Sequence, residues 1–543
     1  MNASEAKAKA AQLKEEGNKC FVAKDYPSAH GKYTKAIDLD DTNAVLYANR
    51  GACSMSMRKY LDAAADCRKA TELDPSYAKA WMRLGAANQH LASYGQSIES
   101  YEKALSVLSA ENLTPADIRL KEQAESELAA VRRKAAPQNA PRHHIITRFG
   151  PDKMPWQRAE RLVNERLAEY GETPQCAHSS AWLMYGAATQ WNAGIQNMKN
   201  MKRVRTAQGE AGMQVMMGVL DDLSNAVLQD DRVFHIEDQN FIELYNNQVT
   251  GESGQFKAWV NEGPQQIFPA ALKMQREQGW AVVRPALATT VRAYIMRGFM
   301  ESGLRNRHDT GVEFIGKAIE IIRWGRKTWQ FVRKEDRGVI FEDTFLIGVQ
   351  NMHLEIFMKA YQQNPGLDAK YSLTELLQHA EDIVETIEKL PVPQNVDPGF
   401  TLAFYVYPKA RSFAMVGYFH NQMAQLRDPS QSNEILEHRQ HAATAYLTAA
   451  ETYPEDDECH AWYIKCALDV MYYAAAPVGS VLGAMEDLRK SIPKMKRLWE
   501  HSALAQGGRD KALERVLEQE SRLRARLRAH EVDLDTLIVD GPP

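Results

Sequence analysis

Five polar residues in the first hundred positions have side chains that bind carboxylates: Lys14, Asn18, Asn49, Lys79 and Arg83. Residues three or four apart share one face of a helix, which groups Lys14 with Asn18 and Lys79 with Arg83. Three cations on such stripes, with no acidic residue at the same positions, predict an anion site. Asparagine amides add paired contacts to a peptide backbone or a carboxylate, so a peptide ligand suits this set.

A period of 34 residues runs through the same segment and predicts how these side chains are brought together. Equivalent positions carry residues of one kind in three successive copies: Gly17, Gly51 and Gly85; Ala36, Ala70 and Ala104; Tyr33, Cys67 and Tyr101; Leu13, Tyr47 and Trp81. The period is typical of a helix–turn–helix solenoid, in which small residues let paired helices approach each other. Equivalent stripes of successive repeats stack into one concave surface, so we expect the five polar side chains to share a groove.

The segments LKEEGN, LYANR and YAKAWMR, which carry these five residues, resemble the two-carboxylate clamp of tetratricopeptide-repeat (TPR) co-chaperones. The resemblance covers residues 10–136 and implies a TPR domain. It also implies that the five residues hold the C-terminal tail of the 70-kDa or 90-kDa heat-shock chaperones, which ends in Glu-Glu-Val-Asp. The two carboxylates are then the Asp side chain and the chain terminus. The alternative is an ordinary solvated basic face.

Four neighbouring positions bear on which chaperone is preferred. Phe21 and Ala52 suit an apolar pocket for the penultimate Val of the tail. His90 stands where related proteins often have a bulky aromatic residue, and Ser56 where some have a further Lys. The choice between the two chaperones therefore stays open.

The composition is that of a folded protein and argues against several classes of function. The chain has 543 residues, 44% hydrophobic and 25% charged, enough for about three domains or one extended array. Its net charge of −4 does not favour nucleic acid or anionic membranes. Six cysteines without a CxxC pair, and no secretory pattern, predict reduced thiols and a cytoplasmic protein, with access to the nucleus left open. The uncharged stretch Val470 to Met485 is too short and too interrupted for a membrane span.

Helical periodicity predicts an all-α protein with a solenoid followed by a large helical region. We expect a TPR domain at 1–136, closed by a capping helix over Thr114–Lys134, a linker at 137–156, and helical parts at 157–395 and 396–543. The predicted helices of the second region share clear 3.6-residue patterning and are Ser179–Gln229, Val283–Ser302, Gly311–Arg326, Phe341–Gln362, Leu373–Leu390, Thr401–Gln425, Glu434–Thr452, Glu458–Tyr473, Val481–His501 and Asp510–His530.

Faint copies of the repeat recur in the second region. Tyr446, Ala449 and Pro454 are spaced as in the N-terminal array, with Trp462 expected in the same packing layer, and the segments around Gly298 and Ala318 are a weaker copy. A divergent helical-repeat domain is the interpretation that follows, with a non-repeat helical domain as the alternative. The tail after residue 530 either folds back on the body or stays loose.

Motifs of catalysis and cofactor binding are missing from the sequence: it has no GxGxxG, P-loop, GxSxG or HExxH. A metal set built from His235–Asp238 with His308 or His353 is conceivable, but scattered surface histidines are the commoner explanation. The basic runs Lys199–Arg205 and Arg522–Arg528 are typical of solvated helix faces.

Three functions therefore remain open. They are a co-chaperone adaptor that also holds a client or second partner, a TPR scaffold for another acidic C-terminus, and an enzyme with an unrecognised helical catalytic domain. The first is favoured, with no catalytic residue, cofactor or metal expected.

Overall fold

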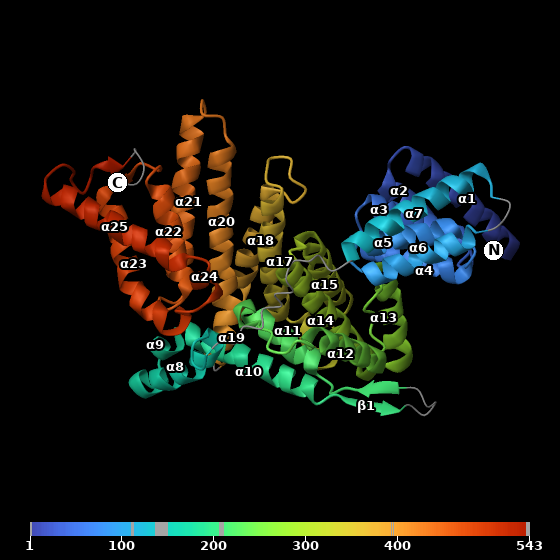
Figure 1. Ribbon diagram of the computed structural model, residues 1–543, viewed down its shortest axis with the longest axis horizontal. Helices are drawn as coiled ribbons and strands as arrows, with labels where there is room; N and C mark the ends of the chain where they lie inside the picture. The colour runs from blue at the N-terminus through green and yellow to red at the C-terminus, as the bar shows by residue number, and fades with distance from the viewer. Residues whose placement is uncertain are drawn as a thin grey trace. The chain divides into compact units, whose positions relative to one another are not determined.

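The computed structural model describes residues 3–109, 113–135, 150–205, 211–391, 394 and 396–538 (Figure 1). It divides into two units: unit 1 combines residues 1–143 with 256–290, and unit 2 combines 144–255 with 291–543. The predicted all-α class is confirmed. The predicted boundaries ran consecutively along the chain, whereas unit 1 takes in a segment from its middle. Most of the predicted linker at 137–156 lies outside the described residues.

Unit 1 begins with seven helices that alternate along the chain as the 34-residue period predicts. They are α1 (Ala3–Val22), α2 (Tyr26–Ile37), α3 (Ala44–Ser56), α4 (Tyr60–Leu73), α5 (Ala78–His90), α6 (Tyr94–Val107) and α7 (Pro115–Ala135). The repeat glycines are where paired helices meet most closely. A Cβ atom on Gly17 would lie 2.8 Å from the Tyr33 ring, and one on Gly85 would lie 2.9 Å from the Tyr101 ring. The period thus reports helix packing within each repeat.

Helix α7 closes the solenoid, as the predicted capping helix over Thr114–Lys134 should. Its start is fixed by reciprocal bonds, in which the Asp117 amide donates to the Thr114 hydroxyl and the Thr114 amide donates to the Asp117 carboxylate, each at 3.2 Å. Ala124, Leu128 and Val131 then pack against the buried side chains of α5 and α6. The last repeat is thereby shielded from water.

Helix α13 (Pro264–Gln278) is the part of unit 1 that comes from the middle of the chain. Just before it, the Asn261 carbonyl accepts from Arg68 at 3.2 Å, and at its start Gln266 donates to Asp66 at 3.1 Å. Gly263 lies so close to α4 that an added Cβ would be 2.1 Å from the Asp62 carboxylate. The segment is therefore held against the second helix of the second repeat.

The remaining elements are again mostly helices. They are α8 (Pro155–Tyr170), α9 (Pro174–Ala177), α10 (Ser180–Lys199), α11 (Val219–Gln229), η1 (Asp231–Val233), α12 (Phe241–Phe256), α14 (Trp280–Arg305), α15 (His308–Thr328), α16 (Lys334–Arg337), η2 (Val339–Phe341), α17 (Asp343–Gln363), α18 (Leu373–Lys389), α19 (Pro398–Thr401), η3 (Leu402–Val406), α20 (Tyr407–Leu426), α21 (Ser432–Thr452), α22 (Glu458–Met471), α23 (Val478–Trp499), α24 (Ala503–Gln506) and α25 (Arg509–Arg528). Four short strands complete the list: β1 (Lys202–Arg205), β2 (Ala211–Gln214), β3 (Ala476–Pro477) and β4 (Leu537–Ile538).

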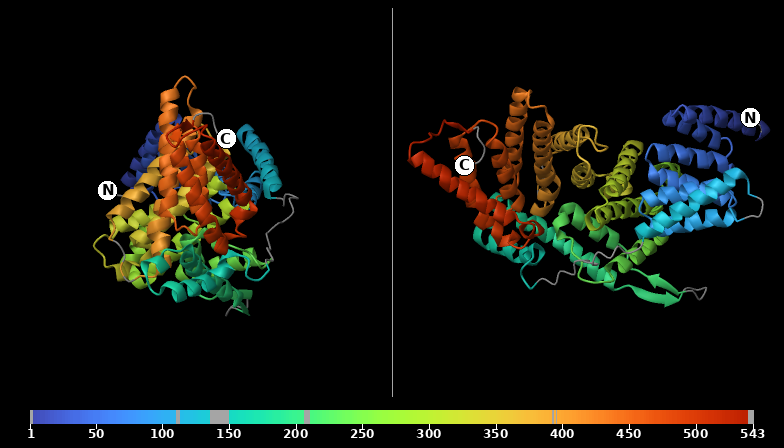
Figure 2. Two further views of the ribbon diagram at one scale, coloured as in Figure 1. Left: turned by 90° about the vertical axis from the view of Figure 1, so that its left-hand side faces the viewer. Right: turned by 45° about the horizontal axis from the view of Figure 1, so that its top comes forward.

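Successive long helices of unit 2 pack on their neighbours in chain order, from α15 through α17, α18, α20, α21 and α22 to α23 (Figure 2). The predicted repeat echoes mark close contacts in this stack. A Cβ on Gly417 would lie 2.7 Å from the Tyr446 ring, and one on Gly298 would lie 2.8 Å from Ile315. Tyr446 and Ala449 are buried as expected. Trp462 is only half-buried, so its placement in the packing layer was wrong.

Two further expectations need correction or completion. Ser179–Gln229 is not one helical stretch, because α10 ends at Lys199 and an antiparallel β1–β2 hairpin precedes α11. The run Lys199–Arg205 is thus mostly strand and not a helix face. The tail folds back, since β4 pairs with β3 and the Gly479 amide donates to the Leu534 carbonyl at 2.8 Å. Among the helices described, none combines the length and hydropathy of a membrane span.

Candidate binding groove

The five predicted polar residues lie on the first helices of the three repeats. Lys14 and Asn18 are one turn apart on α1, Asn49 is on α3, and Lys79 and Arg83 are one turn apart on α5. Repeat geometry aligns these helices as neighbours in one layer, and α3 contacts α5 directly. The second helices α2, α4 and α6 pack on the other side of that layer.

A chain of polar contacts links three of these side chains across the three repeats. The Asn18 carboxamide oxygen accepts from the Tyr33 hydroxyl at 2.8 Å and from the Asn49 side chain at 3.4 Å. The Asn49 oxygen in turn accepts from Arg83 at 3.4 Å. Arg83 also donates to the Ala48 carbonyl at 2.7 Å. The bonds hold the carboxamide oxygens inward, which leaves the Asn18 amide and the remaining guanidinium donors for a ligand.

The cations of this group are poorly neutralised by the protein. Within the described part of the chain, Lys79 and Arg83 form no ion pair, and Lys14 reaches only its neighbour Glu15, at 3.6 Å. Lys79 is exposed, and Lys14 and Arg83 are half-buried. Cationic donors with little or no neutralisation by the protein are what a carboxylate ligand requires.

Asp66 and Arg50 anchor the helix pair that carries Asn49. The Arg50 guanidinium on α3 meets the Asp66 carboxylate on α4 in two bonds, of 2.9 and 2.7 Å. Burial raises the pKa of Asp66, although the paired Arg50 opposes that shift. The ion pair is buried, so breaking it would leave an unpaired charge inside the repeat.

The four residues predicted to bear on specificity lie near this layer. Phe21 is half-buried and meets Tyr26 edge to face, with ring centroids 5.4 Å apart. Ala52 is half-buried on α3, and Ser56 is exposed at its end. His90 stacks on Tyr60 at 4.3 Å, with the two rings 3° from parallel. His90 therefore supplies a flat ring pair at the end of α5.

The conceivable metal set is not assembled by the fold. His235 stacks on Trp156 and its Nδ1 atom meets the Val233 carbonyl at 2.7 Å, while His308 bonds to Ser302 at 2.8 Å. His353 contacts His379 and Phe357 instead. Across the residues that the structure describes, no group of three or more His, Cys, Asp or Glu is arranged to hold a metal ion.

Two hollows among the described residues of unit 2 were not predicted from the sequence. One, of about 350 Å³, is lined by Ser179, Asp456 and Lys494 among others. Ser179 there caps α10 and bonds to Asp456, so its hydroxyl already has a structural partner. The other, of about 40 Å³, is lined by charged residues including Asp231. No local motif marks either, because the lining residues are distant in sequence.

Comparison with known proteins gives matches in the repeat region. The tetratricopeptide repeat family model matches residues 78–107. Small glutamine-rich tetratricopeptide repeat-containing protein 2 of Saccharomyces cerevisiae is 42% identical over 104 residues, which are 19% of this chain and 30% of the yeast protein. The Hsp70-Hsp90 organizing protein of Triticum aestivum is 41% identical over 96 residues, 18% of this chain and 16% of the wheat protein.

Among solved structures, this chain is similar to the first TPR of Spaghetti (RPAP3), which is bound to the HSP90 peptide SRMEEVD. The two are 34% identical over a match that covers 24% of this chain and 95% of the solved chain, with a TM-score of 0.22. The family model and the two curated relatives identify the N-terminal repeats as tetratricopeptide repeats. The chain spans less than a third of the length of either relative.

Proposed function

We propose that this protein is a co-chaperone adaptor. Its N-terminal groove binds the C-terminal tail of a 70-kDa or 90-kDa heat-shock chaperone, and its helical unit 2 holds a client or second protein. The observation that carries the proposal is the linked set Asn18, Asn49 and Arg83, flanked by Lys14 and Lys79, on three adjacent first helices. The names of the relatives, which include an Hsp70-Hsp90 organizing protein, support it.

The two carboxylates of a Glu-Glu-Val-Asp tail divide the five residues between them. Lys14, Asn18 and Asn49 take one, and Lys79 and Arg83 take the other, one turn apart on α5. Charge-assisted hydrogen bonds of this kind are stronger than neutral ones, by about a factor of two. Phe21 and Ala52 receive the side chain of the penultimate Val, which precedes the Asp that carries both anions. We place this activity in the cytoplasm, with nuclear access left open.

The alternatives rest on weaker observations. A scaffold for another acidic C-terminus would use the same groove, and only the sequence of the tail distinguishes it. An enzyme would need a pocket with a positioned nucleophile and base. The larger hollow of unit 2 instead has Ser179 as a helix cap and Glu455 paired with Lys494. We therefore expect no catalytic activity from the chain.

Calorimetric titration with a peptide ending in Glu-Glu-Val-Asp tests the proposal. Replacing both Lys79 and Arg83 by Ala removes charge-assisted bonds worth roughly 1.5–3 kcal/mol each. Each lost bond should weaken binding by about ten- to a hundredfold. Amidation of the peptide terminus should weaken it as strongly, since one of the two anions is lost. Lys103→Ala, an exposed cation on α6, is the control and should bind like the wild type.

The two alternatives give different results in the same assay. An amidated peptide that binds as tightly as the free one would show that the groove does not recognise a chain end. Tight binding of acidic tails in general, with no preference for Val before the terminal Asp, would favour the scaffold over the co-chaperone.

A further inference from the structure

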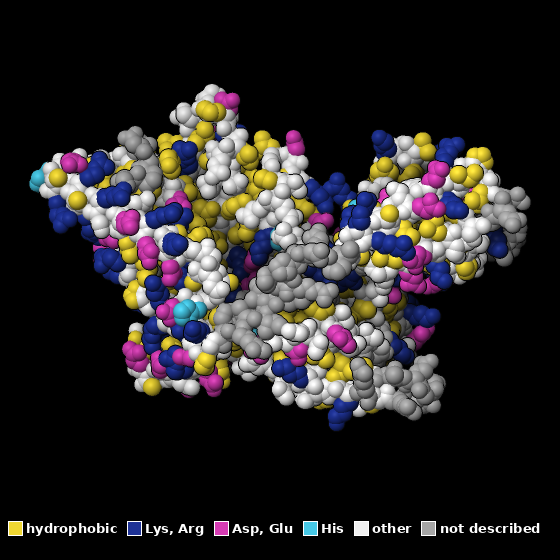
Figure 3. Space-filling view, viewed as in Figure 1, with side chains coloured by type: hydrophobic (Ala, Val, Ile, Leu, Met, Phe, Trp, Pro, Cys, Tyr) yellow, Lys and Arg dark blue, Asp and Glu magenta, His cyan; other side chains and the backbone are white. Residues whose placement is uncertain are grey.

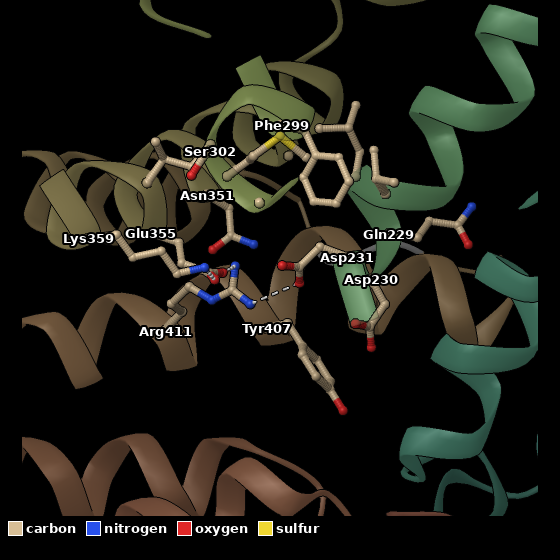
Figure 4. A pocket seen from close by; sticks show the side chains of 16 residues that line it. Gln229, Asp230, Asp231, Phe299, Ser302, Asn351, Glu355, Lys359, Tyr407 and Arg411 are labelled. Atoms are coloured by element: carbon tan, nitrogen blue, oxygen red, sulfur yellow. Dashed lines mark hydrogen bonds and ion pairs between the residues drawn. The ribbon is translucent and has the colours of Figure 1, made fainter. Parts of the chain in front are cut away.

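The small hollow of unit 2 lies among elements far apart in the chain. Its walls come from α11, η1, α14, α17 and α20 (Figure 4). Apolar side chains form part of the lining, among them Phe299, Met352 and Ile356. Its volume is about 40 Å³, which is room for a few water-sized groups. In the space-filling view, apolar side chains also gather over the face of unit 2 around α20 (Figure 3).

The charged residues of this hollow are unequally paired. Glu355 has two close partners, Lys359 at 2.6 Å and Arg411 at 2.9 Å. Asp230 faces away to Arg232, at 2.7 Å. Asp231 has only Arg411, at 3.8 Å, and no hydrogen bond to its carboxylate within the described residues. The carboxylate of Asp231 is thus the anion in the hollow that lacks a close donor.

A second oxygen in the hollow lacks a donor as well. Asn351 is 7% exposed, and its side-chain oxygen is buried without a hydrogen-bond partner among the described residues. Figure 4 shows Asn351 and Asp231 directed toward the same space, beside Arg411. A buried polar atom without a partner costs about 1–3 kcal/mol, so the Asn351 oxygen, beside the partly exposed carboxylate of Asp231, indicates that a donor belongs there.

We propose that this hollow binds the ammonium group of a lysine side chain of a bound polypeptide, which donates to Asp231 and Asn351. An ammonium is a compact charge with three donors, whereas a guanidinium is a planar fork that needs more room and more acceptors. The side chain's methylene stem lies against Phe299 and Met352. The inference extends the role proposed for unit 2, and the polypeptide part of it rests on that role.

The probe for this site is Nα-acetyl-lysine methylamide, followed by saturation-transfer NMR with the full-length protein. The norleucine compound has the same four-carbon side chain without the ammonium, so it should bind at least tenfold more weakly. Asp231→Asn should also weaken lysine binding at least tenfold, and Asn351→Leu severalfold. Glu381→Gln, an exposed carboxylate on α18, is the matched control and should bind like the wild type.

Two results of these titrations would overturn the lysine-binding proposal. Equal binding of the lysine and norleucine compounds by the wild-type protein, or no binding of either, overturns the proposal without any variant that must fold. Unchanged binding by Asp231→Asn overturns it too. The Lys79→Ala/Arg83→Ala variant separates the two proposals, because loss of tail binding there should leave lysine binding intact.

Discussion

At the scale of single residues, Asp231 should reduce the stability of the fold at neutral pH. Burial, followed by the charge of Glu355, raises the pKa of Asp231 to about 6, while Arg411 and Lys359 oppose the shift and Asp230 adds to it. The folded chain therefore binds this proton more tightly than the unfolded chain does. The contribution of Asp231 to the free energy of unfolding is favourable at acidic pH and is lost as the pH rises through 4 to 6.

Asp231→Asn should accordingly stabilise unit 2 at pH 7. Each tenfold change in proton affinity is worth about 1.4 kcal/mol, so we expect a gain of roughly 1–3 kcal/mol. The gain should shrink toward pH 4, where the wild-type carboxyl is itself protonated. Hydrogen exchange of α17 and α20 at the two pH values measures it. A variant less stable than the wild type at pH 7 would mean that the Arg411 contact outweighs the cost of burial.

The anion-binding residues could be predicted from sequence, but Asp231 and Asn351 could not. Lys14, Asn18, Asn49, Lys79 and Arg83 occupy helix positions that a fixed period of 34 brings into register, so their neighbourhood follows from spacing alone. The residues of the hollow come from helices joined by loops of unequal length. Their proximity depends on tertiary packing, which no local period encodes.

At the scale of elements, the glycines of the repeat are expected to be required by packing and not by backbone conformation. A Cβ on Gly85 would press 2.9 Å from the Tyr101 ring, which is itself buried, whereas one on Gly31 in α2 would meet nothing within 4 Å. Alanine is the better helix former by about 1 kcal/mol, so both substitutions gain helix propensity. Only Gly85→Ala must also displace a ring.

We therefore expect different effects on stability from two chemically identical changes. Gly85→Ala should destabilise the repeats by about 1–3 kcal/mol through overpacking. Gly31→Ala should leave them unchanged or stabilise them by up to about 1 kcal/mol. Hydrogen exchange of α5 and α6 in the full chain reports both. If the two variants behave alike, the space beside Gly85 is not what selects glycine there.

Helix limits were predictable to within a few residues for the long helices, for example Gly311–Arg326 against His308–Thr328. The β1–β2 hairpin could not be predicted from the sequence. Its strands have four residues each, too few for alternation to stand out from the helical patterning on either side. The two-residue β3–β4 pair was missed for the same reason: contact with the tail, and not local sequence, makes it a strand.

At the scale of the whole molecule, the discontinuity of unit 1 changes what an isolated repeat domain should do. Residues 1–136 contain all seven helices of the solenoid and its cap, so we expect that fragment to fold cooperatively. It lacks the segment that covers His30, Asp62 and Asp66, however. Burial lowers the pKa of His30, which bonds to Gln265 in the complete chain. The fragment should therefore be folded but less protected along α4 than the same residues in the full chain.

Gly263→Ala in the full chain should reproduce the loss of protection along α4. An added Cβ would lie 2.1 Å from the Asp62 carboxylate and 2.9 Å from the Asp62 Cα atom, and backbone cannot yield as a flexible side chain does. We expect faster hydrogen exchange in α13 and α4, close to that of the 1–136 fragment for α4. Gly254→Ala, where an added Cβ meets nothing within 4 Å, is the control.

Affinity for a Glu-Glu-Val-Asp peptide should not change, because Lys79 and Arg83 project from α5 on the other helix layer. A variant that loses peptide affinity along with α4 protection would instead mean that the α13 segment sets the shape of the groove.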